Sequence, residues 1–237
     1  MTENQTPLLQ VKDLVAGYGG SRVLQGVSFD VYREPLGMIG RNGMGKSTLA
    51  TVLAGMLPAE SGQILMDGKE ITGYAPNRVV KSGIAYVPQG RRIFPSLTVH
   101  EHLTMVGAKS SDRWNPNTVY DLFPRLAERK KNGGGELSGG EQQMLAIGRA
   151  LLTNPKLLLM DEPSEGLAPA IIEHLANVFR QLVSEGLAVL LIEQNIHFAL
   201  ELCDRILIMV NGDIATEVTS EELSKNTELQ ERFLSVV

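Results

Sequence analysis

The sequence predicts an α/β fold with a parallel-sheet core. Short apolar runs in the second half of the chain alternate with helix-like segments, an order that is typical of a parallel sheet covered by helices. These runs have the length of core strands and lie at residues 157–160, 188–192 and 205–210. The first third is different, because its strand-like segments are separated by turn residues. A small antiparallel sheet beside the core is therefore expected from residues 8–19, 22–32 and 62–71.

The segment between these two parts is predicted to be helical. Residues 99–131 contain two or three helical stretches with a polar loop at 108–117, in which Trp114 is expected to be a local packing anchor. Residues 130–136, KKNGGGE, suggest a flexible connection by composition. The C-terminal residues 220–237 suggest a short amphipathic helical ending.

Length and composition fit a globular protein of one large domain or two small ones. The chain has 237 residues, 43% of them hydrophobic, which is enough for a sizeable core. We expect one domain over residues 1–237. It would comprise an antiparallel β subdomain mainly within 8–75, a short helical subdomain at about 90–148, and the parallel-sheet core from the remainder.

Charge and apolar patterning exclude several classes of protein. No apolar run approaches the ~20 residues needed to cross a bilayer, and the N-terminus has no signal-peptide pattern. The single cysteine, Cys203, excludes an internal disulfide, fits a reducing compartment and is expected to be buried. The formal net charge of −5 argues against a nucleic-acid partner, which usually requires a basic face.

Residues 40–48, GRNGMGKST, fit the phosphate-loop pattern G-x-x-x-x-G-K-[ST] between a predicted strand and a predicted helix. Glycines let backbone N–H groups turn toward phosphates, and the helix beginning near Lys46 points its positive end at them. Lys46 supplies charge to the β- and γ-phosphates, and Ser47 offers a hydroxyl to Mg²⁺. The alternative is an ordinary glycine-rich turn. The predicted nucleotide contacts are Gly40, Asn42, Gly43, Gly45, Lys46, Ser47 and Thr48.

Two carboxylates end the apolar run at 157–160. An acid at the carboxyl end of a parallel strand lies where open α/β sheets bind ligands. Asp161 is predicted to hold Mg²⁺, and Glu162 to position or activate the water that attacks the γ-phosphate. A solvated Asp-Glu pair would be the default reading without the phosphate loop.

Residues 137–152, LSGGEQQMLAIGRALL, predict a helix with a defined start. Ser138 and Glu141 have capping-box spacing, so Ser138 could be merely an N-cap. Two adjacent glycines at a helix start are costly, however, and they make sense where an anion must approach the backbone closely.

The segment LSGGEQQ, residues 137–143, resembles the signature motif of ATP-binding cassette (ABC) ATPases. The phosphate loop before it and the acidic strand after it stand in that family's order, and the match covers nearly the whole chain. The resemblance implies a phosphate-loop fold with a RecA-like core that binds ATP and Mg²⁺. It also implies that Ser138, Gly139 and Gly140 act on the nucleotide of a partner subunit, so that ATP is sandwiched between two ATPase subunits.

Further residues carry over one at a time from the resemblance. Tyr18 resembles the aromatic residue that stacks on adenine, although a turn tyrosine is an equal alternative. Gln89 resembles the glutamine that contacts Mg²⁺ and the attacking water, and that links the site to a membrane partner. Phe94 would fill a pocket in that partner.

The family's switch histidine falls on Gln194 when the chains are aligned on residues 188–192. Gln194 is therefore the expected γ-phosphate sensor, and His197 is expected to be a helix residue without a catalytic role. His100, His102 and His174 have no convincing metal-ligand spacing and are expected on helix surfaces.

Several strings, among them VPQGRRIFPSLTV, DEPSEGLAP and LLIEQN, resemble one branch of the family. That branch imports branched-chain amino acids and related amides such as urea. The chain is most similar to the smaller of its two ATPase subunits. The resemblance implies a sister ATPase or a homodimer, two membrane permeases, and indirectly a substrate-binding protein. It places the chain in the cytoplasm, peripheral on the inner face of the cell membrane.

Two other functions remain open at this point. One is export, as in lipid-flipping ABC systems with similar short cassettes. The other is a soluble ABC protein of DNA repair or translation, but those proteins usually carry two cassettes, long insertions or basic extensions. The single cassette and the acidic balance of this chain favour transport.

Overall fold

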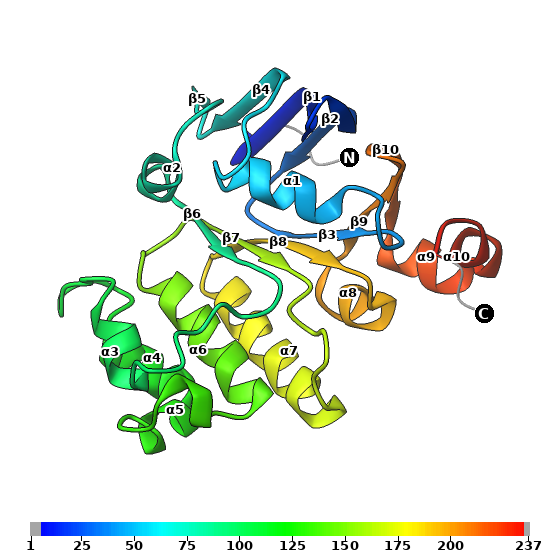
Figure 1. Cartoon of the computed structure of the whole chain (residues 1–237). Coiled ribbons are helices and arrows are strands. Elements are labelled where there is room, and N and C mark those ends of the chain that lie inside the picture. Colours follow the sequence, from blue (N-terminus) through cyan, green and yellow to red (C-terminus); the bar gives the residue numbers. More distant parts are fainter. Residues whose placement is uncertain (1–5, 235–237) are drawn as a thin grey trace.

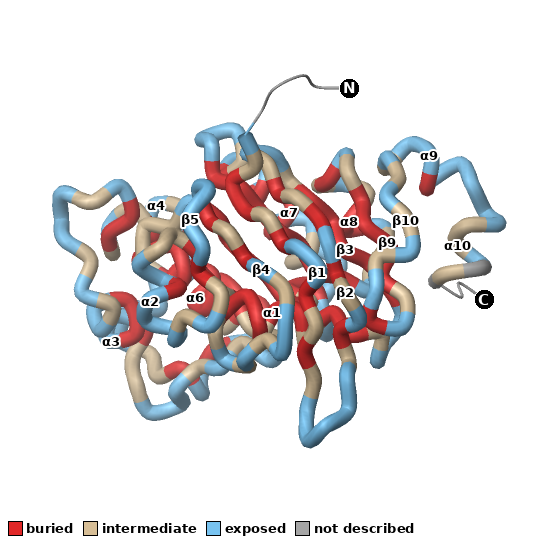
Figure 2. The backbone as a smooth tube through the Cα atoms, turned by 90° about the horizontal axis from the view of Figure 1, so that it is seen from above, coloured by how far each residue is buried: buried red, intermediate tan, exposed pale blue. Residues whose placement is uncertain are grey.

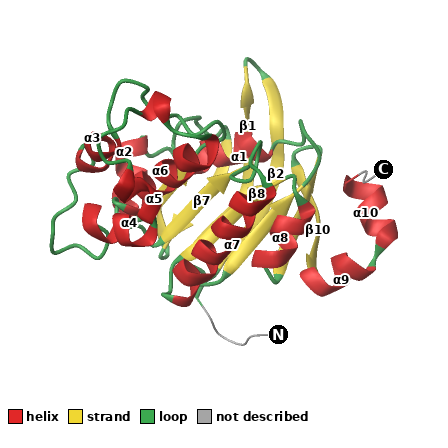
Figure 3. Cartoon of the chain, turned by 90° about the horizontal axis from the view of Figure 1, so that it is seen from below, coloured by secondary structure: helices red, strands yellow, loops and turns green. Residues whose placement is uncertain are grey.

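The computed structural model describes residues 6–234 and confirms the predicted α/β fold. A six-stranded sheet forms the centre of the molecule (Figure 1). Helix α1 and a second, four-stranded sheet lie on one face, and helices α6, α7 and α8 lie on the other (Figures 1 and 3). No helix among the described residues is long and apolar enough to cross a membrane.

The central sheet is parallel except at one edge. Across the sheet the strands are β10 (Asp213–Thr219), β9 (Arg205–Val210), β3 (Pro35–Ile39), β8 (Ala188–Glu193), β7 (Leu157–Asp161) and β6 (Ile84–Val87). Strand β10 pairs antiparallel with β9 and was missed by the sequence analysis. The preceding Asn211-Gly212, both with positive φ, is the hairpin signal that could have found it.

The second sheet is antiparallel, as predicted. Its strands are β2 (Ser21–Val31), β1 (Leu9–Tyr18), β4 (Ser61–Met66) and β5 (Lys69–Glu70). The expected strand at 62–71 is divided into two by Asp67 and Gly68, whose φ values of 49° and 72° make a tight hairpin turn.

The helical segment contains three short helices, α3 (Val99–Thr104), α4 (Pro116–Leu122) and α5 (Pro124–Glu128). Trp114 lies before α4 and is 6% exposed, which confirms it as a packing anchor. The remaining helices are α1 (Lys46–Leu53), α2 (Pro76–Ser82), α6 (Gly139–Leu151), α7 (Pro169–Ser184), α8 (Ile196–Leu202), α9 (Ser220–Lys225) and α10 (Thr227–Leu234).

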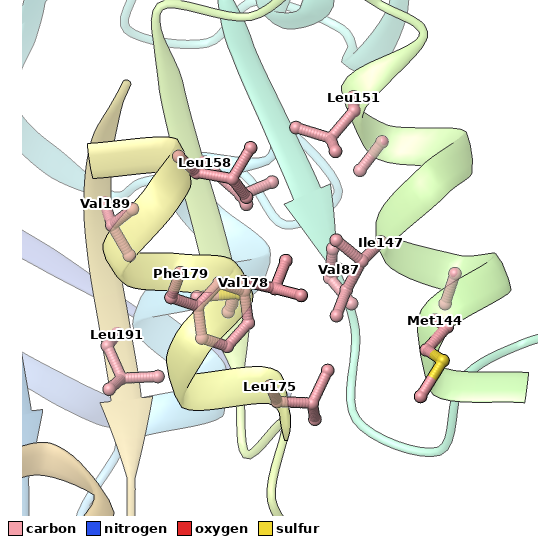
Figure 4. Close-up of a cluster of buried hydrophobic side chains, with 14 of the residues drawn as sticks. Val87, Met144, Ile147, Leu151, Leu158, Leu175, Val178, Phe179, Val189 and Leu191 are labelled. Atoms are coloured by element: carbon pink, nitrogen blue, oxygen red, sulfur yellow. The ribbon is translucent and has the colours of Figure 1, made fainter. Parts of the chain in front are cut away.

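Alternation along the central strands divides the core between the two faces of the sheet. Leu190 of β8 packs toward α1 and the antiparallel sheet, whereas its neighbours Val189 and Leu191 pack toward α7. Figure 4 shows the cluster on the α7 side of the sheet, in which Phe179 of α7 and Ile147 of α6 face the strands. Buried residues follow the strands and inner helix faces, while exposed residues lie mainly in the loops and on outer surfaces (Figure 2).

Two expectations differ from the structure. His102 does not lie on a helix surface, because its side chain is completely buried under the loop that carries Phe94. Residues 130–136, expected from composition to be a flexible connection, have local structure. Gly133 pairs with Thr98, and Gly134–Glu136 form a 3-10 turn, where a Cβ atom on Gly134 would lie 2.4 Å from Ile93. Cys203 is buried, as expected, and burial raises the pKa of its thiol to about 12.

Candidate nucleotide-binding and catalytic site

The phosphate loop connects strand β3 to helix α1. Gly40 directly follows the strand, and a Cβ atom there would lie 2.5 Å from the carbonyl oxygen of Met209 in β9. Gly45 precedes the helix with a φ of 103°, a conformation that favours glycine. Asn42 and Gly43 are exposed in the loop, and Gly43 also has a positive φ. The backbone path therefore explains the glycines that the motif requires.

Lys46 carries a buried cation at the start of α1, with only 4% of the residue exposed. Its Nζ donates to the carbonyl oxygens of Gly40 at 2.7 Å and Arg41 at 3.1 Å. The same atom lies 3.6 Å from Oε1 of Glu162. Lys46 thus joins the phosphate loop to the end of strand β7. Thr48 lies in the first turn of the same helix.

Ser47 and Asp161 meet directly, although 114 residues separate them in the chain. The Ser47 hydroxyl donates to one Asp161 oxygen at 3.1 Å, and the Tyr86 hydroxyl donates to the other at 3.3 Å. Burial, together with the charge of neighbouring Glu162, raises the pKa of the Asp161 carboxyl above its ordinary value. A hydroxyl beside a buried carboxylate is an oxygen donor set that suits a hard cation such as Mg²⁺.

Glu162 has a strained backbone, with a φ of 50°. Its N–H donates to the Ile192 carbonyl oxygen of β8 at 2.8 Å, which helps to hold this conformation. Its carboxylate lies between Lys46 on one side and the side-chain amide of Gln89 on the other, at 3.0 Å. Strain of this kind is common where a side chain must be aimed at a reacting group.

Gln89 follows strand β6 and is half-buried. Its amide nitrogen donates to Glu162 and to Glu165, at 3.0 Å each. The segment after β7 and the segment after β6 are therefore joined by one side chain. Glu165 was not among the predicted site residues.

Three further residues that the sequence singled out, Tyr18, Gln194 and His197, are all exposed. Tyr18 ends strand β1 and is 53% exposed. Gln194 is exposed directly after β8, and its N–H donates to Glu193 at 3.1 Å. His197 is an exposed residue of the first turn of α8, so its expected place in a helix is confirmed.

The predicted capping box at the start of α6 is present. Ser138 accepts the N–H of Glu141, whose carboxylate accepts the N–H of Ser138 at 2.8 Å. The two glycines have packing partners within the subunit. A Cβ atom on Gly140 would lie 2.9 Å from Ile171 of α7, and one on Gly139 would lie 3.1 Å from the guanidinium of Arg91. Across residues 6–234, no hydrogen bond or ion pair joins these residues to the phosphate loop.

The structure therefore brings together five predicted side chains, those of Lys46, Ser47, Gln89, Asp161 and Glu162. Three polar residues that hold this site or border it were not predicted from the sequence, namely Tyr86, Glu165 and Glu193. Glu193 had a usable signal, because it is an acid that ends an apolar strand, as Asp161 is.

A phosphate loop, an acidic strand end and a parallel sheet together define a phosphate-loop nucleotide hydrolase. Residues 24–165 match the family model described as ABC transporter, which covers more than half of the chain. The chain belongs to this family, that of the ABC transporter ATPases.

Two relatives and one solved structure show the similarity along the whole chain. The BraG protein of Pseudomonas aeruginosa, a high-affinity branched-chain amino acid transport ATP-binding protein, is 45% identical and covers 92% of this chain and 95% of its own. The LivF protein of Archaeoglobus fulgidus, a probable protein of the same kind, is 34% identical over 97% and 100%. The ADP conformation of an ATP-binding cassette of an ABC transporter superposes with a TM-score of 0.80 at 31% identity, over 96% and 97%.

Proposed function

We propose that this protein hydrolyses ATP to power the uptake of branched-chain amino acids through a membrane permease. The observation that carries the proposal is the convergence of Lys46, Ser47, Asp161 and Glu162 at one end of the central sheet. The 45% identity to a branched-chain amino acid transport ATP-binding protein supports the choice of substrate over a lipid or a urea-like amide.

The phosphate loop would hold the phosphates of ATP. Lys46 would exchange its two carbonyl partners for β- and γ-phosphate oxygens, since these are stronger acceptors for a buried ammonium group. The exposed ring of Tyr18 offers a face on which adenine could stack.

Ser47 and Asp161 would hold Mg²⁺, and the oxygen of the Gln89 amide would add a third group. The fit rests on Asp161, because a buried carboxylate with a raised pKa is stabilised by a nearby cation. Bound there, the ion would neutralise charge that develops on the phosphates. Tyr86 would keep the second Asp161 oxygen in place.

Glu162 would orient the attacking water and accept its proton. Gln89 holds the Glu162 carboxylate from one side, so the same amide could report the state of the site to the permease. Gln194 would contact the γ-phosphate through its amide N–H, which donates a hydrogen bond without a positive charge.

A second ATPase subunit would complete the site. The N-terminus of α6, with Ser138, Gly139 and Gly140, presents a positive dipole end that could cap the γ-phosphate bound to a partner. The partner would be a sister ATPase or a second copy of this chain. The pair would bind two permeases at the inner face of the cell membrane, and a substrate-binding protein would deliver the amino acid.

Reconstituted transport tests this proposal. The protein is purified with its associated membrane subunits, placed in vesicles with the substrate-binding protein, and assayed for ATP-dependent uptake of labelled leucine. We expect uptake that Glu162→Gln abolishes and that Glu222→Gln, in the distant helix α9, leaves intact. ATP hydrolysis that moves lipid or urea but no branched-chain amino acid would contradict the assigned substrate.

A further inference from the structure

Glu193 is a buried acid for which the mechanism above has no role. It is the last residue of strand β8 and is only 1% exposed. Strand β8 lies between β3, which leads to the phosphate loop, and β7, which leads to Asp161 and Glu162. The carboxylate therefore sits at the carboxyl end of a central strand, between the two neighbouring strand ends that supply the site.

The two oxygens of Glu193 serve two different loops. Oε1 accepts the N–H of Ser164 at 2.9 Å, in the segment that follows β7. Oε2 accepts the N–H groups of Gln194 at 3.1 Å and Asn195 at 3.2 Å, in the turn that follows β8. One carboxylate thus bridges the segment that carries Glu162 and the turn that carries Gln194.

The cost of burying the Glu193 carboxylate indicates that a glutamate is specifically required at this position. Burial raises the pKa of the Glu193 carboxyl, whereas the hydrogen bonds from Ser164, Asn195 and Gln194 oppose that rise. An apolar residue would fit the strand but would leave the buried Ser164 N–H and the two partly buried N–H groups of the turn without this acceptor. A glutamine has one oxygen, so it could serve only one of the two loops.

We propose that Glu193 is a positioning residue that couples the turn of Gln194 to the segment of Glu162. This inference rests on the proposed function, in which Gln194 contacts the γ-phosphate and Glu162 orients the water. A movement of the Gln194 turn toward phosphate displaces the Glu193 carboxylate, because Oε2 is bound to two consecutive N–H groups. The same displacement pulls on Ser164, two residues from Glu162, so that the sensor and the base reach their positions together.

Turnover kinetics of the full-length protein test the coupling through a double-mutant cycle. Glu193→Gln should lower kcat about tenfold through misplacement of Glu162, with the KM for ATP changed less than about twofold because the phosphate loop is untouched. In a Gln194→Ala background, Glu193→Gln should lower kcat less than about twofold further. The side-chain amide that senses the γ-phosphate is then already gone, so Glu193 has no sensor left to couple to Glu162. An equal loss in both backgrounds would show a merely structural role and overturn the proposal.

Two further variants serve as controls, one for the general loss of a carboxylate and one for the sensor role of Gln194. Glu222→Gln removes another carboxylate that accepts a backbone N–H, that of Thr219 at 2.8 Å, and should leave kcat unchanged. If Gln194→Ala alone leaves kcat unchanged, the sensor role in the proposed function fails, and the link between the loops is then decided by hydrogen exchange.

Hydrogen exchange tests the link without measuring turnover, and its decisive comparison is made in the wild-type protein. In the wild-type protein, a non-hydrolysable ATP analogue with Mg²⁺ should slow exchange of the Ser164 and Asn195 amides together. In Glu193→Gln the two amides should no longer respond together. Protection of one amide without the other in the wild-type protein would overturn the coupling, whatever the stability of the variant.

Discussion

Glu162 and Lys46 form a pair whose members have different expected roles in ATP turnover. Their charged atoms lie 3.6 Å apart, and Gln89 holds the other side of the carboxylate. Lys46 belongs to the phosphate loop, so its expected role is to bind ATP. The strained backbone of Glu162 sets the direction of its carboxylate, whose expected role is to orient the attacking water. Substitutions at Glu162 should therefore slow ATP hydrolysis without weakening ATP binding.

We expect Glu162→Gln to lower kcat by about 10²- to 10³-fold, because the amide keeps the size of the side chain but cannot accept a proton. ATP affinity should change little, since the phosphate loop is intact. Steady-state hydrolysis and equilibrium binding of labelled ATP measure the two quantities. Glu173→Gln on α7, exposed at the surface, is the control. A variant that hydrolyses ATP at the wild-type rate would remove Glu162 from the mechanism.

Gln194 and His197 are distinguished by a pH profile of turnover. His197 is exposed in α8, and Gln194 has no titratable group. We expect Gln194→Ala to lower kcat about tenfold through one lost phosphate hydrogen bond, and His197→Ala to leave it unchanged. A steep loss of wild-type turnover near the histidine pKa of about 6.5, absent from His197→Ala, would contradict this assignment.

The predictability of the individual site residues depended on local pattern. The phosphate loop was predictable because its motif lies within residues 40–48 and the strand and helix that flank it are adjacent in the sequence. Tyr86 was not, because its contact with Asp161 joins positions 75 residues apart and a strand tyrosine is an ordinary core residue. His102 was misplaced for a similar reason, since only the packed loop above it shows that it is buried.

Helix α3 is tied to the loop before it through His102. The ring Nε2 accepts the N–H of Phe94 at 3.0 Å, and Nδ1 donates to the Thr98 carbonyl oxygen at 2.8 Å. Burial lowers the pKa of His102, the charge of Arg149 acts in the same direction, and Thr98 and Glu101 oppose it. A protonated ring would direct a second N–H at the Phe94 N–H, so this contact requires the neutral form.

The sign of the pH dependence follows from that lowered pKa. Above the unfolded pKa of about 6.5 the stabilisation by neutral His102 is fully present, and it is lost as pH falls toward the folded pKa. We expect the free energy of unfolding to decrease from pH 7 to pH 5 more steeply in the wild-type protein than in His102→Gln. Urea unfolding across this range measures it. Parallel pH dependences in the two proteins would contradict the neutral assignment.

Strands were predictable from the sequence where their apolar residues form a clear local pattern. Strands β7, β8 and β9 were found because they are continuous apolar runs. Strand β10 was missed because its residues alternate between intermediate and exposed, so it has no apolar signature of its own. Its existence depends on pairing with β9 at the sheet edge.

At the scale of the whole molecule, the sheet separates the helices that carry the nucleotide motifs. Helix α1, with the phosphate loop at its start, lies on one face, and α6, with the signature motif, lies on the other (Figure 1). The sequence predicts both motifs but not their separation, because distance in space depends on the sheet order. This arrangement fits a site that a second subunit completes.

The most direct test of that account is the mass of Glu162→Gln in solution with Mg·ATP, measured by light scattering after size exclusion. The variant should bind ATP without hydrolysing it, so a closed pair would persist. We expect a mass near twice the 25.8 kDa of the chain, lost when Gly139→Asp is introduced at the signature motif. A mass that remains at 25.8 kDa with ATP bound, both alone and with the sister ATPase subunit added, would contradict closure of one subunit over the nucleotide of another.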